Sequence, residues 1–214
     1  MAETTPAQDI AQPATFAFDA ETEAEVARQI AKYPPGRQAS AVIPLLYLVQ
    51  EQMRRQTGSA WVPLAAMNEV ARRLDMAPIR VYESATFYTM FNLHPIGKWH
   101  LQVCTTTPCW LRGSDDVVHA CREATGIKGW GETSADGLFT MTEVECLGAC
   151  VNAPVIQINN GDLYEDLDAA LTTQLLEALR RGEPPPAGSM SGRQTSAPEG
   201  GPNTLTTLHF EPGT

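Results

Sequence analysis

The sequence contains little that would direct the chain into a membrane or an export pathway. Its 214 residues include no apolar run of about 18, the length at which a transmembrane helix becomes a candidate. Residues 1–19 carry acidic side chains but no Lys or Arg, which argues against a secretory signal or an Arg-rich transit peptide. The sequence therefore predicts a protein that acts in a cytosol-like compartment, with no direct membrane insertion.

Basic residues are also scarce. Lys and Arg together number 15 against 25 for Asp and Glu, so the formal net charge is -10. The imbalance lies in residues 98–181, where acidic residues outnumber basic ones about two to one, whereas residues 20–97 are nearly balanced. Because such a surface repels a phosphate backbone, we do not expect nucleic acid as a partner.

Cysteine is the third scarce residue, with five in the chain. A reducing compartment keeps thiols open, and an odd number would leave one cysteine unpaired, so a disulfide framework is not expected. Thiolate ligation of a metal is the better interpretation.

The hydrophobic pattern changes in the middle of the chain. After a polar arm at residues 1–19, helical spacing of apolar residues and breaks at Pro and Gly predict a helical bundle over residues 20–97. Over residues 98–182, apolar alternation and a four-residue leucine repeat predict strand, helix, strands and helix, a compact α/β structure. Residues 183–214 are rich in Pro, Gly, Ser and Thr and predict a flexible tail, disordered or extended. The fold class is therefore α/β (α+β).

Four of the cysteines form two pairs. Cys104 and Cys109 have four residues between them, and Cys146 and Cys150 have three. Each pair is expected in a loop directly after a predicted strand. Two neighbouring strands would present both loops at the same edge of the sheet, so the four thiolates can converge on one centre.

The spacing of the cysteines favours one kind of centre without excluding a second. A thioredoxin-type dithiol requires C-x-x-C, which neither pair has. Tetrahedral zinc accepts four thiolates and remains possible, but unequal loops give it no support. Two cysteines on each of two irons is the ligand set of a 2Fe-2S cluster, and Gly148 would let backbone amides approach sulfur closely.

Other candidate groups are assigned no role in the site. The fifth cysteine, Cys121, follows Val117 and Val118 at helical spacing and is expected to be a buried helix residue. His94, His100 and His119 lie outside the cysteine loops. No Gly-rich phosphate loop, Ser-His-Asp set or paired-carboxylate cleft is present in the sequence, so we assign no catalytic residues.

Several stretches of the chain closely resemble one known family. VCTTTPCWLRGS and ECLGACVNAPVIQINNGDLYEDL, together with RVYESATFYTMFNLHPIGKWH and SAVIPLLYLVQEQ, are similar to the thioredoxin-like 2Fe-2S subunit of respiratory complex I, the NADH:quinone oxidoreductase. The resemblance covers about residues 20–181 and both cysteine loops match without a gap. It implies a helical bundle joined to a thioredoxin-like ferredoxin domain, with Cys104, Cys109, Cys146 and Cys150 as cluster ligands.

The resemblance also implies a place in a larger assembly. The family's subunit lies beside the flavoprotein subunit that binds FMN and NADH, exchanges one electron with the flavin, and belongs with the large iron-sulfur subunit of the peripheral arm. The expected location is the cytoplasmic side of the inner membrane, or the matrix side in a mitochondrion. NAD-linked hydrogenases and formate dehydrogenases share the module, so the parent complex stays open, and so does a mainly structural role as an assembly adaptor.

Overall fold

The computed structural model describes residues 11–196, which divide into two compact units between Lys98 and Trp99. The first unit is helical and the second contains all the strands found in the described residues. No helix between residues 11 and 196 is long and apolar enough to cross a membrane.

Four α-helices and one short 3-10 helix form the first unit. Asp19 caps the first helix, Pro78 opens the last, and Gly58 ends the second at a left-handed φ of 79°. These positions are where the sequence offers start and stop signals, and the predicted helical bundle is confirmed. The elements are α1 Ala20–Ala31, η1 Gln38–Ala41, α2 Val42–Thr57, α3 Leu64–Leu74 and α4 Pro78–Phe87.

The core of the helical unit forms where the apolar faces of these helices meet. Leu45 and Val49, four residues apart on α2, are fully buried, as are Val70 and Leu74 on α3. Burying one such side chain contributes about 1.5–3 kcal/mol. The four-residue spacing in the sequence is therefore what holds the bundle together.

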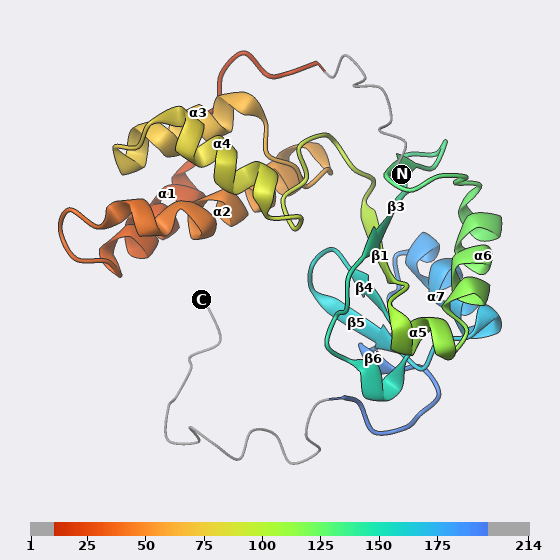
Figure 1. The fold of residues 1–214 in the computed structure, drawn as a ribbon. Helices are drawn as coiled ribbons and strands as arrows, with labels where there is room; N and C mark the ends of the chain where they lie inside the picture. The colour runs from red at the N-terminus through yellow and green to blue at the C-terminus, as the bar shows by residue number, and fades with distance from the viewer. Residues whose placement is uncertain (1–10, 197–214) are drawn as a thin grey trace. The chain divides into compact units, whose positions relative to one another are not determined.

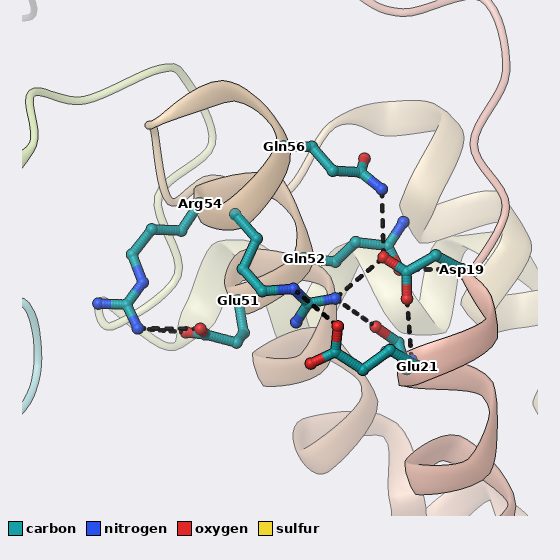
Figure 2. Close-up of polar contacts among 8 residues, drawn as sticks. Asp19, Glu21, Glu51, Gln52, Arg54 and Gln56 are labelled. Atoms are coloured by element: carbon teal, nitrogen blue, oxygen red, sulfur yellow. Dashed lines mark hydrogen bonds and ion pairs between the residues drawn. The ribbon is translucent and has the colours of Figure 1, made fainter.

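Asp19 fastens the start of α1 to α2 (Figure 2). Its carboxylate accepts a hydrogen bond from the Thr22 backbone N–H at 2.8 Å and another from Arg55 Nη2 at 2.9 Å, while its own backbone N–H donates to Gln52 Oε1 at 3.0 Å. The Thr22 backbone and side chain, and then Arg55, lower the pKa of the Asp19 carboxyl. It is ionised at neutral pH, and an anion at this position favours the helix N-terminus.

A mixed six-stranded sheet, in the order β2-β3-β1-β4-β5-β6, forms the centre of the second unit. Strand β1 pairs with β3 in parallel and with β4 antiparallel. A parallel pair requires a crossover connection, and α5 and α6 lie in the segment that returns the chain from β1. The strands are β1 Trp99–Cys104, β2 Glu132–Thr133, β3 Phe139–Val144, β4 Ile156–Ile158, β5 Asp162–Glu165 and β6 Gly188–Ser189.

Two helices pack side by side against this sheet (Figure 1). They are α6, Ser114–Thr125, and α7, Ala169–Arg181. Leu101 and Val103 of β1 belong to the same buried cluster as Val117 and Leu175 of these helices. Alternation along β1 places these two side chains on the helix-covered face of the sheet. The predicted α/β class of this part of the chain is confirmed.

Part of the segment after α7, which the sequence predicts to be a disordered or extended tail, is extended along the edge of the sheet. Residues 188–189 add strand β6 to the edge of the sheet, and Met190 N–H continues the contact by donating to the Glu165 carbonyl at 2.9 Å. Buried carboxylates at Glu165 and Asp166 supply acceptors to this segment, a long-range arrangement that composition alone does not reveal. Residues 183–196 are thus held against the second unit. The rest of the predicted tail, 197–214, lies outside the described residues.

Candidate iron-sulfur site

The two cysteine pairs arise at the same edge of the sheet. Cys104 is the last residue of β1, and in the parallel pairing it stands opposite Val144, the last residue of β3 and two positions before Cys146. The expectation that neighbouring strands deliver both pairs to one edge is confirmed. Cys150 then opens a 3-10 turn, η2 Cys150–Asn152.

Cys109 departs from the expected loop, because it lies inside a short helix, α5 Thr107–Leu111. Thr106 precedes this helix and Pro108 occupies its first turn, a combination that favours a helix start and that the sequence contains. The short helix places the Cys109 side chain in the interior, where it is 2% exposed.

The first pair is buried in an apolar environment. Cys104 is 1% exposed, and its Sγ lies 3.2 Å from the Thr106 hydroxyl. Burial raises the pKa of the Cys109 thiol to about 12, with further contributions from its hydrogen bond to Cys104. Both cysteines pack in one cluster with Ala149, Ala153 and Val155. Without a bound cation the Cys109 thiol therefore stays protonated.

The second pair is exposed and polarised. The sulfur atoms of Cys146 and Cys150 lie 3.1 Å apart. The contact with Cys150 and the Gly148 backbone N–H lower the pKa of Cys146, whereas the same contact raises the pKa of Cys150. Gly148 has a φ of 83°, a left-handed conformation that lets its amide face the sulfur. A Cβ at this position would meet no atom within 4 Å, so glycine is required here by the left-handed φ and not by the close approach expected from the sequence.

Electrostatic contacts join the two pairs into one group. Cys104 and Cys150 both raise the pKa of Cys109, and the Thr106 hydroxyl reaches both Cys104 and Cys146. The sequence does not single out Thr106, although its position next to a helix start is an available signal. In residues 11–196, no group of three or more His, Cys, Asp or Glu side chains has the geometry to hold a metal ion.

Cys121 lies apart from these four. It is fully buried in α6, within the cluster formed by the sheet and its two helices, and burial raises the pKa of its thiol to about 12. The interpretation of Cys121 as a core residue agrees with this environment.

The chemistry of the donor set, two pairs of thiols, fits a 2Fe-2S cluster, although no three of these side chains stand in metal-binding geometry in residues 11–196. Such a cluster takes two cysteine thiolates on each iron, and the sheet edge offers two pairs of thiols. Its sulfur atoms also accept hydrogen bonds, which the Gly148 amide and the Thr106 hydroxyl already make to thiols here. The buried pair borders an apolar wall and the exposed pair faces solvent, so such a cluster would be half shielded from water.

Comparison with known proteins agrees with this chemistry. The family model described as thioredoxin-like [2Fe-2S] ferredoxin matches residues 26–180, a span that includes all four paired cysteines. The chain belongs to this family. The predicted cofactor type, a 2Fe-2S cluster, is thereby confirmed.

Curated relatives of this 2Fe-2S protein point to one complex. The chain is 53% identical over 163 residues to the E subunit of NADH-quinone oxidoreductase from Rickettsia typhi, covering 76% of this chain and 92% of that one. It is 54% identical over 163 residues to the same component of the Rickettsia prowazekii complex, covering 76% and 88%. The resemblance stated from the sequence motifs is confirmed.

A solved structure shares the fold. An NAD+-reducing [NiFe]-hydrogenase in the air-oxidized state superposes with a TM-score of 0.54 at 22% identity, over 65% of this chain and 23% of the hydrogenase chain. At this identity the likeness concerns the fold alone.

Proposed function

We propose that this 2Fe-2S protein is an electron-transfer subunit of an NADH:quinone oxidoreductase. In this proposal Cys104, Cys109, Cys146 and Cys150 bind one cluster, which exchanges single electrons with the FMN of an adjacent flavoprotein subunit. The protein has no catalytic site of its own and attaches peripherally, together with the large iron-sulfur subunit, on the cytoplasmic side of the inner membrane or on the matrix side. The main support for this proposal is that two thiol pairs meet at one edge of the sheet. The chain that contains them is 53% identical to a component of an NADH-quinone oxidoreductase.

The residues around the thiols suit electron transfer. When bound, a 2Fe-2S cluster accepts and releases one electron without binding substrate, because thiolates fill all its iron positions. Gly148 N–H and Thr106 Oγ1–H direct positive ends of dipoles at the sulfur atoms, which favours the reduced, more negative state. The apolar side chains of Ala153 and Val155 keep water from the buried pair.

Large apolar side chains are exposed beside the cysteines and support a subunit contact there. Trp110 and Leu111 of α5 directly follow Cys109 and are 57% and 70% exposed, and Val151, next to Cys150, is 69% exposed. Exposed apolar groups clustered by sequence at a functional site are typical of interaction surfaces. This surface would bring the flavoprotein subunit next to the exposed cysteine pair.

Electron exchange can be measured in both directions by anaerobic mixing with the flavoprotein subunit. We expect NADH to produce the EPR signal of the reduced cluster, or NAD+ to remove it from dithionite-reduced chain once the excess dithionite is taken away. Either change requires the flavoprotein subunit. Testing both directions makes the outcome independent of which centre has the lower reduction potential.

The control mixtures lack either the nucleotide or the flavoprotein subunit. If the flavoprotein subunit forms a complex with the chain and the signal changes in neither direction, the proposed exchange with FMN is wrong.

A further inference from the structure

Residues 188–196, here called the strap, cross the part of the fold that follows Cys150. The strap begins as β6, parallel to β5, and ends where Ser196 binds the buried Glu165 carboxylate through its backbone N–H at 2.9 Å and its hydroxyl at 2.7 Å. Glu165 is 3% exposed. A buried carboxylate requires hydrogen-bond donors, and the strap supplies them.

The centre of the strap meets a second buried carboxylate. Asp166 is 8% exposed and accepts from Ser189 Oγ at 2.6 Å and from Arg193 Nη1 at 2.9 Å. Its φ of 56° is left-handed, a conformation that costs a non-glycine residue free energy unless its surroundings hold it. The ion pair with Arg193 and the serine hydroxyls provide that support.

The same strap contacts reach the cysteine loop through Asn152. This residue ends η2, two positions after Cys150, and is 2% exposed. Its Nδ2 donates to the Gln194 carbonyl at 2.6 Å, its Oδ1 accepts from Arg193 Nη2 at 3.4 Å, and its carbonyl accepts from Asp166 N–H at 2.7 Å. Asn152 is therefore held by hydrogen bonds to Gln194, Arg193 and Asp166. Its own backbone N–H donates to the Ala149 carbonyl at 3.0 Å, and this bond spans Cys150.

We propose that Arg193 is a positioning residue for the cluster, acting through Asp166 and Asn152 to fix the conformation of residues 149–153. Two of its guanidinium nitrogens, fixed in one plane, contact an anion and an amide oxygen that lie on different segments, a geometry that the single nitrogen of a lysine ammonium matches less well. The effect on the cluster rests on the proposed function, because it requires Cys150 to be a ligand. The effect on the loop does not.

Amide hydrogen exchange on the full chain as purified tests the loop. In Arg193→Ala we expect exchange at the Asn152 and Asp166 amides to be about tenfold faster, the change that follows from losing roughly one ion-paired hydrogen bond. Exchange at Val118 and Leu176, in α6 and α7, should not change. Arg193→Lys should give an intermediate rate, and Arg181→Ala, which removes an exposed arginine near Glu183, should resemble wild type.

EPR of the reduced, cluster-loaded chain tests the link to iron. Arg193→Ala is expected to shift the g-values and to lose iron to a chelator about tenfold faster, the lower limit for residues that orient metal ligands. The positioning role would be overturned if amide exchange in residues 149–153 of Arg193→Ala were as slow as in wild type. It would also be overturned if exchange in α6 and α7 became faster by the same factor. Wild-type g-values and chelation rate would overturn its effect on the cluster. If the wild-type chain shows no 2Fe-2S signal, the proposed function is wrong. The hydrogen-exchange result then still tests whether Arg193 fixes the conformation of residues 149–153.

Discussion

Replacing Cys146 with serine is expected to abolish the EPR signal of the reduced chain and to lower its iron content at least about tenfold. Serine is nearly isosteric, but its hydroxyl is far less acidic than a thiol and is a poorer iron ligand than a thiolate, so we expect the cluster to be lost from the variant. Cys146 is exposed and its substitution opens no cavity, so the protein should still fold. Iron analysis and EPR after anaerobic purification measure the effect.

Cys121→Ala is the matched control for this substitution. Cys121 lies on the buried face of α6, so removing its sulfur should cost about 1 kcal/mol of stability and leave the iron content and EPR signal unchanged. Equal iron in the Cys146→Ser and wild-type chains would contradict the assignment of Cys146. If the complex containing Cys146→Ser assembled without its EPR signal yet kept normal flavin chemistry with NADH, the chain would be a structural adaptor.

In the cluster-free chain, iodoacetamide is expected to label Cys146 at least about fiftyfold faster than Cys109 at pH 8. The pKa of Cys109 is about 12 and that of Cys146 is lowered below 9.0, so the thiolate fractions at pH 8 differ by at least about a thousandfold. The greater nucleophilicity of a more basic thiolate offsets about twentyfold of this difference. Burial of Cys109 slows its reaction further.

The pH dependence of labelling has a definite direction. As pH rises, labelling of Cys146 should level off once pH passes its lowered pKa, whereas labelling of Cys109 should keep rising about tenfold per pH unit toward 12. Peptide mass spectrometry after timed quenching gives both rates. Comparable labelling rates for the two cysteines at pH 8 would contradict the stated difference in pKa and exposure between Cys109 and Cys146. Binding of iron should slow the labelling of Cys146 by iodoacetamide.

The general position of the site could be predicted from local patterns. Alternating apolar residues indicate β1 and β3, and the position of each cysteine pair just after its strand is visible in the sequence. Because β1 and β3 are parallel neighbours in register, Cys104 and Cys146 emerge at one edge. The sequence singles out Gly148, but its left-handed φ of 83° is known only from the structure.

Contacts between distant segments could not be predicted in this way. Phe18 falls in what reads as a polar arm, yet it is buried in the helical unit beside Phe16, since two aromatic residues in a polar stretch give no periodicity. Arg193 and Asp166 are 27 residues apart in the sequence. The sequence places Arg193 in the predicted tail and Asp166 near the end of a predicted strand. Their pairing depends on the completed sheet, which sequence spacing does not specify.

The central claim is that the four paired cysteines bind one 2Fe-2S cluster. Iron and acid-labile sulfide analysis of the anaerobically purified full chain, with EPR after dithionite reduction, tests it most directly. We expect about two irons and two sulfides per chain and a rhombic S = 1/2 signal. A colourless protein that holds a single zinc ion and shows no such signal would contradict the claim.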